Sequence, residues 1–426
     1  MQTAFSLAQL ADPAIAEADG ILRNCVHCGF CTATCPTYVL LGDELDSPRG
    51  RIYLIKDLLE QDRAPTSEEV VHIDRCLSCL SCMTTCPSGV NYMHLVDQAR
   101  AHVAETYERP VSDRLMRRLL AAVLPRPGLF RAAVRAAALG RPFRKLMPKV
   151  LRALLDAAPV RLPVKRDTAT ATKAEGPRRK RVALLAGCVQ QVLAPQINEA
   201  TVRLLARHGC DIVVPPDAGC CGALVHHLGE EDKALHAARR NVDTWTAVLE
   251  DGGLDAIVIN ASGCGTMVKD YGFMLRLDPT YAAKAARISA LARDISEVMA
   301  DLGLKPQARH DVTVAYHAAC SLQHGQKIVN QPKALLAAAG YRVHDVPEGH
   351  LCCGSAGTYS LLQPDIATAL RDRKVANIQS LRPDVVAAGN IGCMEQLAGG
   401  TGIPVVHVAE LLDWATGGPK PGRLNA

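Results

Sequence analysis

Eight cysteines near the start of the chain fall into two groups with one spacing, C-x2-C-x2-C-x3-C-P. We call these stretches the first comb, CVHCGFCTATCP, and the second comb, CLSCLSCMTTCP. Their cysteines are Cys25, Cys28, Cys31 and Cys35 in the first comb and Cys76, Cys79, Cys82 and Cys86 in the second. Thiolates at this spacing are typical ligands of a cubane [4Fe-4S] cluster, which takes three cysteines from one compact loop and a fourth from elsewhere.

The x3 step in each comb turns its fourth cysteine away from the other three. In two-cluster ferredoxins that fourth cysteine ligates the other cluster. The spacing therefore predicts two [4Fe-4S] clusters, with ligands Cys25, Cys28, Cys31 and Cys86 for the first and Cys76, Cys79, Cys82 and Cys35 for the second. Pro36 and Pro87 are expected to stop each loop from continuing as a helix, and Gly29 to allow a close backbone approach.

Structural zinc is the alternative for the combs, because C-x2-C pairs also bind Zn²⁺. Zinc sites normally use two pairs a dozen or more residues apart, whereas each comb has four cysteines in eleven residues, so the spacing favours clusters. The first basic residue is Arg23, and no apolar segment follows an N-terminal basic region. We therefore expect no secretion signal, a cytoplasmic location, and 17 reduced cysteines that serve metals rather than disulfides.

The cysteines farther along the chain belong to an internal repeat. RVALLAGC ends at Cys188 and TVAYHAAC ends 132 residues later; the CCG triplet at 220–222 returns at 352–354 with the same offset, and IVINASGC matches VAAGNIGC. Such self-similarity indicates a duplicated unit. The candidate metal ligands are Cys188, Cys220, Cys221 and Cys264 in one unit and Cys320, Cys352, Cys353 and Cys393 in the other. Zinc or a further iron–sulfur cluster is the predicted occupant, and buried core cysteine is the alternative.

The helices and strands that position these cysteines can be predicted from the spacing of apolar residues. Apolar spacing predicts helices over 47–61, between the combs, and over 91–108, after the second comb. From residue 181 the pattern alternates, with strands at 181–186, 211–214 and 255–260 and helices near 195–208 and 231–250. Alternation of this kind predicts parallel α/β layers, with the cysteines beyond the carboxyl ends of strands, where ligands collect.

The predicted fold class is an α+β multidomain chain. It has an N-terminal α-helical dicluster ferredoxin module over 1–110, a basic helical connector and linker over 111–180, and duplicated α/β cysteine-rich domains over 181–311 and 312–426. Arg49 and Arg51, near the first comb, are either solvated residues at a helix start or cations that neutralise anionic clusters. Cys210 has no counterpart in the repeat and is expected to be a small buried side chain.

Four histidines near the downstream cysteines are weaker ligand candidates, and a surface or hydrogen-bonded role is expected for each. They are His226, His227, His317 and His350.

Charge is distributed unevenly along the chain. Residues 112–181 hold 19 Lys and Arg against 4 acidic residues, a net +15, so the rest carries −10 of the overall +5. Arginines alternate with leucines at helical spacing up to about residue 159, and a polar linker follows at 165–181. One interpretation is connecting helices with solvated basic faces; the other is docking on an acidic partner or, peripherally, on an anionic membrane surface. No nucleic-acid motif accompanies the charge, so no nucleic acid is expected as a partner.

The twin combs, the SPRGR segment and the two C…CCG…C units together resemble the iron–sulfur subunits of glycolate oxidase (glycolate dehydrogenase) over essentially the whole chain. The resemblance implies an FAD-containing partner subunit that oxidises glycolate to glyoxylate, while this chain passes electrons to a quinone or other acceptor. No flavin is expected on this chain, since no G-x-G-x-x-G opens a helix after a strand.

The wider group includes subunits of heterodisulfide reductase, lactate-utilisation proteins and anaerobic glycerol-3-phosphate dehydrogenase. Its full pattern ends in C-x-x-C, where this chain has Ala261 and Asn390 at the first position. This departure puts the non-cubane cluster of heterodisulfide reductase in doubt and leaves a cubane, zinc or no metal. The alternatives in function are an equivalent subunit of a lactate or glycerol-3-phosphate dehydrogenase, or a non-enzymatic redox-sensing scaffold.

Overall fold

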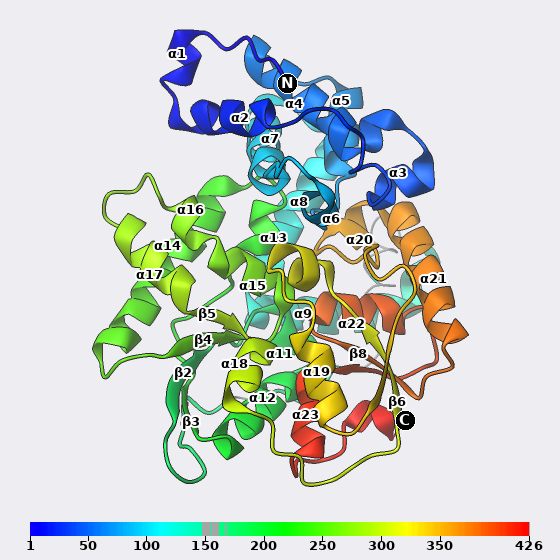
Figure 1. Cartoon of the computed structure of the whole chain (residues 1–426). Coiled ribbons are helices and arrows are strands. Elements are labelled where there is room, and N and C mark those ends of the chain that lie inside the picture. The colour runs from blue at the N-terminus through cyan, green and yellow to red at the C-terminus, as the bar shows by residue number, and fades with distance from the viewer. Residues whose placement is uncertain (147–154, 156–161, 167, 426) are drawn as a thin grey trace.

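The structure is a computed structural model that describes residues 1–146, 155, 162–166 and 168–425. The N-terminal residues form a helical module (Figure 1). Its helices are α1 (Leu7–Leu10), α2 (Pro13–Arg23), α3 (Pro36–Leu41), α4 (Pro48–Gln61), α5 (Ser67–Asp74), α6 (Ser81–Thr85) and α7 (Tyr92–Thr106), with a 3-10 turn, η1 (Glu44–Asp46).

The two helices predicted beside the combs are present as α4 and α7. Ser47 begins α4, because its hydroxyl accepts a hydrogen bond from the Gly50 backbone N–H and Pro48 occupies the first turn, where no N–H partner is needed. The apolar faces of α4 and α7 pack on each other through buried residues such as Ile55 and Leu95.

Pro36 does not stop a helix, contrary to the prediction. It is the first residue of α3, and the preceding residue, Cys35, is in extended conformation. The fixed φ of proline suits the first turn of a helix. The proline therefore directs the chain away from the first comb by starting a helix.

The remainder of the described chain contains two sheets, with strand orders β1-β3-β2-β4-β5 and β7-β6-β8-β9. The strands are β1 (Ala171–Thr172), β2 (Lys180–Leu184), β3 (Cys210–Val213), β4 (Ala256–Ile259), β5 (Ala292–Asp294), β6 (Thr313–His317), β7 (Arg342–Asp345), β8 (Val385–Ala388) and β9 (Val405–His407). All neighbours pair in parallel except β1, which is antiparallel to β3.

The duplication seen in the sequence is also structural. Val182 of β2 pairs with Ala256 of β4, and Val314 of β6 pairs with Val385 of β8, which is the same register in both units. The three predicted strands of the first unit are confirmed to within about two residues. The fourth strand of that unit, β5, was not predicted, because its three residues are too few to show a period.

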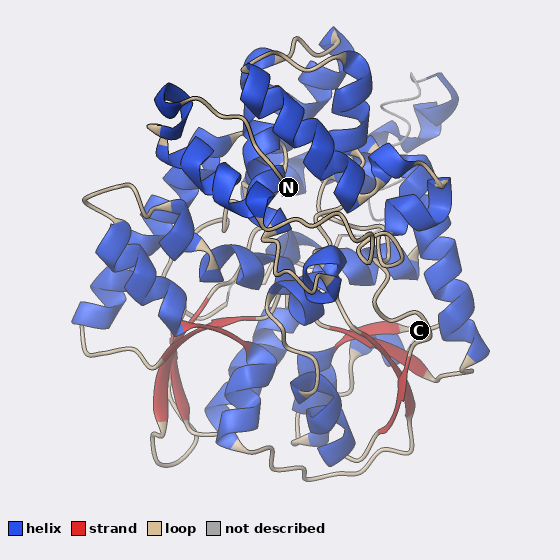
Figure 2. Cartoon of the chain, turned by 45° about the horizontal axis from the view of Figure 1, so that its top comes forward, coloured by secondary structure: helices blue, strands red, loops and turns tan. Residues whose placement is uncertain are grey.

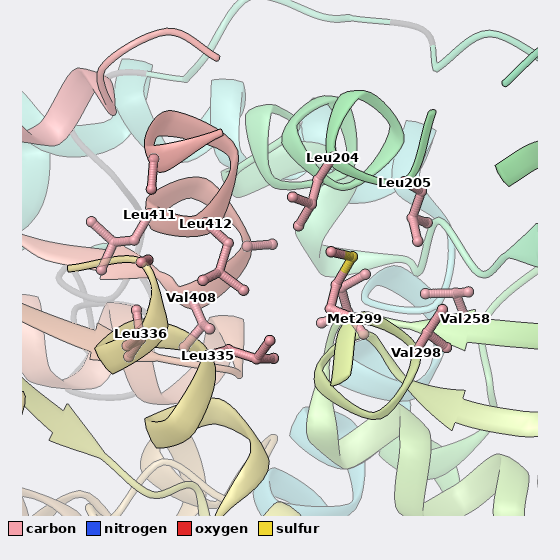
Figure 3. Close-up of a cluster of buried hydrophobic side chains, with 14 of the residues drawn as sticks. Leu204, Leu205, Val258, Val298, Met299, Leu335, Leu336, Val408, Leu411 and Leu412 are labelled. Atoms are coloured by element: carbon pink, nitrogen blue, oxygen red, sulfur yellow. The ribbon is translucent and has the colours of Figure 1, made fainter. Parts of the chain in front are cut away.

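Helices from both units meet between the sheets. They are α12 (Gln196–Arg207) and α18 (Ile295–Leu302) of the first unit and α19 (Gln331–Ala338) and α23 (Val408–Ala415) of the second. Leu204, Met299 and Leu412 are buried in one cluster there, as Figure 3 shows. Because the two units bury a common core, they pack as one body. Cys210 is fully buried in the same cluster, which confirms its predicted role.

The remaining helices of the two α/β units lie around the sheets and between the sheets and the helical module (Figure 2). They are α11 (Val189–Leu193), α13 (Ala223–His226), α14 (Glu231–Glu250), α15 (Ser262–Lys269), α16 (Tyr271–Met274), α17 (Ala282–Leu291), α20 (Tyr359–Leu362), α21 (Pro364–Ser380) and α22 (Ile391–Ala398), with a π-helical turn η3 (Ser321–Gly325) and a 3-10 turn η4 (Gly422–Leu424).

The helical module lies against both α/β units, on the side of the cysteine loops (Figures 1 and 2). The imidazole of His94 in α7 is 2.9 Å from the carboxylate of Asp270 in the first unit. Toward the second unit, Leu77 packs in an apolar cluster with Cys320 and Cys352. The module therefore contacts both units and packs on the thiols of the second.

The basic segment begins with α8 (Val111–Val123), α9 (Pro127–Gly140) and the 3-10 turn η2 (Arg141–Leu146). The predicted segment continues through residues 147–154, 156–161 and 167, which lie outside the described residues. The predicted polar linker at 165–181 contains β1, which adds an edge strand to the first sheet. No helix in the described part of the chain is both long enough and apolar enough to cross a bilayer.

Candidate iron–sulfur sites

A hollow of about 440 Å³ that opens to solvent lies beside the first comb. Its cysteines are Cys25, Cys28, Cys31, Cys82 and Cys86. Cys28 is exposed, and the neighbouring Val26 and Phe30 are 66% and 63% exposed. An occupant of this first hollow would therefore lie close to the molecular surface.

A second hollow of about 310 Å³ lies beside the second comb. Its cysteines are Cys35, Cys76, Cys79 and Cys82. Cys35, Cys76 and Cys82 are buried, and Leu77 and Leu80 lie on the same lining. This second hollow is thus the more enclosed of the two.

Each hollow combines three cysteines of one comb with the fourth cysteine of the other. Cys86 lines the hollow of the first comb, Cys35 lines that of the second, and Cys82 borders both. Cys35 is also close enough to Cys79 and Cys82 to affect their ionisation. These are the two sets of four thiols that the spacing suggested; the assignment of ligands itself remains a prediction.

The backbones of the two combs turn at matching positions. His27 and Ser78 have φ of 54° and 47°, and Gly29 and Leu80, two residues later, have φ of 85° and 62°. A left-handed conformation is unfavourable for a residue as bulky as leucine, and such strain concentrates at functional sites. Left-handed turns can aim backbone N–H groups at an anion, and the Ser78 N–H lies 3.4 Å from the Sγ of Cys76.

Burial raises the pKa of three comb thiols, those of Cys31, Cys79 and Cys82. It raises the pKa of Cys31 to about 11. Burial first, and then neighbouring thiolates, raise the pKa of Cys79 and Cys82 well above the ordinary value. Thiols packed this closely ionise together only when metal ions share their charge. The donor sets therefore fit an iron–sulfur cluster in each hollow.

Arg51 lies against the second hollow and is only 1% exposed. Its guanidinium donates to the His72 carbonyl at 2.7 Å and lies 3.8 Å from the Sγ of Cys35. It also contacts Asp46, which is fully buried, at 3.3 Å. Burial opposes the charged form, but nearby Cys76 and other anions offset this, so the pKa of Arg51 is raised.

The solvated role that the sequence allowed is therefore wrong for Arg51, which is a buried cation beside a four-thiol site. Arg49 is different, since its side chain is 33% exposed and pairs with Glu44 at 2.7 Å.

Arg100 of α7 fixes the loop of the second comb. Its guanidinium donates to the Cys76 carbonyl and to the Ser78 hydroxyl, both at 2.6 Å. The hydroxyl of Tyr92, at the start of α7, lies 3.8 Å from the Sγ of Cys76. The predicted helix after the second comb thus supplies the side chains that hold that comb in place.

The four thiols of the first α/β unit meet after the ends of β2, β3 and β4. Cys220 lies between Cys188 and Cys221, and Cys221 also contacts Cys264. The hydrogen bonds from Cys188 and Cys221 lower the pKa of Cys220 to about 3, whereas the pKa of Cys188 is raised. The four thiols of this unit thus lie in contact with one another, as suits a metal-binding group.

The four thiols of the second unit meet in the same way. Cys320 contacts Cys352, Cys352 contacts Cys353, and Cys353 contacts Cys393. This set adjoins the second hollow, because Cys79 is an electrostatic neighbour of Cys320 and Cys352 and packs in the same cluster. The two hollows and the thiols of the second unit therefore form a continuous series of sulfur sites.

The histidines divide into different roles. His226 pairs with Asp97 of α7 at 3.2 Å, in line with the hydrogen-bonded role expected, and His350 is exposed. His317 is only 1% exposed and faces Cys353 and Cys393, so a surface role is wrong for it. The sequence analysis named His317 only as a weaker ligand candidate, although its match in the first unit, Leu185, marks the position as different.

Models of two protein families match the chain. A cysteine-rich domain model matches residues 182–269 and 314–398, and a 4Fe-4S dicluster domain model matches residues 24–90. The fold and the paired thiol sites thus define a dicluster iron–sulfur protein with two cysteine-rich domains.

Curated relatives place the chain more narrowly. It is 45% identical to the glycolate oxidase iron–sulfur subunit of Escherichia coli K12, over 97% of this chain and 99% of that protein. It is 30% identical to the probable glycolate oxidase iron–sulfur subunit of Bacillus subtilis 168, over 94% and 95%. The chain belongs to the family of glycolate oxidase iron–sulfur subunits.

Two further similarities are partial or structural. Lactate utilization protein A of an Exiguobacterium species is 29% identical over 54% of this chain and 96% of that protein. The crystal structure of a hypothetical protein from Helicobacter pylori aligns with a TM-score of 0.56 at 10% identity, covering 97% of this chain and 74% of the other. At that identity, the second similarity concerns the fold alone.

Proposed function

We propose that this chain is the electron-transfer subunit of a glycolate dehydrogenase, in which an FAD-containing partner subunit oxidises glycolate to glyoxylate. The two cysteine-lined hollows are the observation that supports this proposal most, in a chain whose relatives are named as subunits of glycolate oxidase. Iron–sulfur clusters bound there supply one-electron chemistry, which links a two-electron flavin oxidation to a quinone or another acceptor.

The proposed cofactors are two [4Fe-4S] clusters with the exchanged cysteine ligands, and no flavin on this chain. Residues 1–110 form the cluster module and 111–180 the connector. The cysteine-rich domains, 181–311 and 312–426, bring their own thiols beneath the module. Their two sets of four cysteines are the proposed ligands of further metal centres.

The proposal is tested with the anaerobically purified chain together with its flavoprotein partner. We expect roughly eight irons from the combs and bleaching of the iron–sulfur absorbance after glycolate is added. Lactate and glycerol-3-phosphate serve as parallel substrates. Reduction by lactate but not glycolate would overturn the substrate assignment, and zinc in place of iron would overturn the cluster assignment.

The first hollow is the proposed point of electron exchange with the redox partner. Cys28 is exposed and is surrounded by exposed apolar side chains, Val26, Phe30 and Tyr53. The redox centres of two proteins lie a short distance apart only where the protein surfaces are in close contact. Aromatic side chains are common anchors of such interfaces.

We predict that Phe30→Glu slows reduction by the glycolate-loaded partner roughly tenfold, because it places a charge in the core of this interface. Iron content should stay unchanged, since Phe30 contributes no thiolate. Leu7→Glu is the matched control, as Leu7 is 89% exposed on α1 and lines neither hollow. Stopped-flow absorbance measures the rate; equal rates for both variants would place the interface elsewhere.

The basic segment supports a second proposed contact, with the cytoplasmic face of a membrane. Leu115 and Leu119 on α8 and Leu139 on α9 are 67%, 43% and 79% exposed. Exposed arginines, Arg114 and Arg118, lie on the same helix as the first two leucines. An amphipathic basic surface of this kind binds anionic interfaces, with each Lys or Arg near the surface contributing about 1 kcal/mol.

We predict that the assembled complex floats with anionic vesicles at low salt and is released at high salt, because exposed charges are screened. Replacing Arg114 and Arg118 by Glu should weaken this flotation. The Arg371→Glu variant, which changes charge on helix α21 of the second unit, serves as the control. Equal flotation with neutral vesicles, or none with either lipid, would assign the basic surface to a protein partner or to solvent.

A further inference from the structure

We infer that His317, Cys353 and Cys393 form a mixed imidazole–thiolate metal site in the second α/β unit, which the first unit cannot form. The inference deepens the proposed role of the downstream cysteines as metal ligands and rests on it. It names a nitrogen donor beyond the cysteines and distinguishes the two repeats.

The geometry of three side chains carries the inference. His317 is the last residue of β6 and is 1% exposed, while Cys353 and Cys393 are fully and 96% buried. One ligand atom from each of the three lies within 4.8 Å of the others. The three residues come from separate segments of the chain and are brought together by the fold, as the ligands of a metal commonly are.

The imidazole of His317 has an unexplained polar atom. Its Nε2 is buried and has no hydrogen-bond partner within the described residues. Leaving such a group unpaired costs roughly 1–3 kcal/mol, so buried polar atoms without partners are uncommon. A metal ion held with the two neighbouring thiolates would satisfy this nitrogen.

The first unit differs at the matching position. His317 lies three residues before Cys320, and Leu185 lies three residues before Cys188. Leu185 is 2% exposed and packs in an apolar core. The first unit therefore offers four thiols and no imidazole at this place.

A second difference between the units is the residue at one matching position of helices α14 and α21. The backbone of Ala234 in α14 packs against Gly222, and that of Ala367 in α21 packs against Gly354, which aligns the two helices. This alignment matches Lys374 with Asn241.

Lys374 is a buried cation beside the second set of thiols. It is 2% exposed and donates to the Glu348 carbonyl at 2.6 Å. The thiols of Cys353, Cys320 and Cys352 are its neighbours, and burial lowers the pKa of its ammonium. A buried ammonium needs nearby negative charge, and metal-bound thiolates supply it.

Asn241 in the first unit is neutral and already satisfied. It accepts from the Gly219 N–H and donates to the Cys220 carbonyl and the Tyr271 hydroxyl. The cation nearest the first set, Arg240, lies on an exposed position of α14. The second unit thus differs from the first in placing a buried lysine and an imidazole beside its thiols.

The donor set suits zinc or iron, since both take cysteine thiolate and histidine imidazole together. The metal is identified on the full-length protein, purified anaerobically and again after reconstitution with each ion. Elemental analysis gives the metal content, and X-ray absorption at the iron and zinc edges detects nitrogen ligands.

The test variant is His317→Leu, which introduces the residue of the first unit. We expect it to lose the metal bound beyond the eight irons of the combs, or to lose the nitrogen ligand from the absorption spectrum. His317→Cys should retain metal but without nitrogen. Lys374→Asn, with the residue of the first unit, should release the metal faster to a chelator. The control is His350→Leu, which changes an exposed histidine two residues from Cys352.

Unchanged metal content and unchanged nitrogen scattering in His317→Leu would overturn the inference and leave His317 as a core residue. A wild-type chain with no metal beyond the combs would overturn it equally. The paramagnetic signals of the comb clusters provide the separate check, because they report folding and the proposed electron-transfer role independently of the second unit. Loss of those signals from the wild-type protein would count against the proposed function instead.

Discussion

Replacing Cys35 by serine is expected to remove the cluster of the second comb and to spare that of the first. Cys35 lines the second hollow with Cys76, Cys79 and Cys82, although it lies in the first comb. Iron content should fall from roughly eight to about four, or the cluster should convert to a three-iron form. The paramagnetic spectrum of the reduced variant should match that of Cys76→Ser and differ from that of Cys25→Ser.

The effect on turnover should be equally large. The second hollow lies between the first hollow and the thiols of the second α/β unit, so its loss interrupts the series of sites. Cys210→Ser is the matched control, because Cys210 is fully buried in the core and borders neither hollow. A Cys35→Ser spectrum that matched Cys25→Ser would mean that each comb holds its own cluster with no exchange of ligands.

The second large effect is expected from Arg51→Leu. Removing the guanidinium takes one partner from the carboxylate of Asp46, which is fully buried and keeps Arg75 at 2.8 Å and His72 at 3.0 Å. A buried charge left with no partner costs about 3–5 kcal/mol, so the loss here should be smaller than that. The substitution also removes the positive charge beside Cys35. We therefore expect a lower midpoint of thermal unfolding and faster loss of iron from the second comb to a chelator.

Two variants separate charge from geometry. Arg51→Lys keeps the charge but loses the fork that reaches the His72 carbonyl and Thr37 together, so its effect should be intermediate. Arg49→Leu removes a cation from a partly exposed pair and should cost less than about 1 kcal/mol. If Arg51→Leu were as stable as wild type and released iron at the same rate, Arg51 would have no role at the second site.

Much of this protein was predictable from local patterns. The spacing of the combs predicted cluster-binding loops, because three thiolates around one cubane must come from one short stretch of chain. The helices α4 and α7 followed from apolar periodicity, and the strands β2, β3 and β4 from short β-branched runs. The repeat offset was visible because duplication preserves spacing even where side chains differ.

Other features depended on contacts between distant segments. The strand β1 lies in a mostly polar stretch with no run of large apolar residues, and it forms because the edge of β3 is available to pair with it. The burial of Arg51 depends on Asp46 and on the carbonyl of His72. The local pattern of residues does not indicate which distant residues will become such partners.

The sequence by itself determined the kind of chemistry, since the number, type and spacing of the cysteines are local properties. Only the tertiary structure decided the order of the sites, with the first hollow near solvent and the second against the thiols of the second unit. It also decided that His317 faces the buried Cys353 and Cys393. The physical reason is that ligand sets and electron paths depend on distances in space, and the packing of helices and sheets sets those distances among residues hundreds of positions apart.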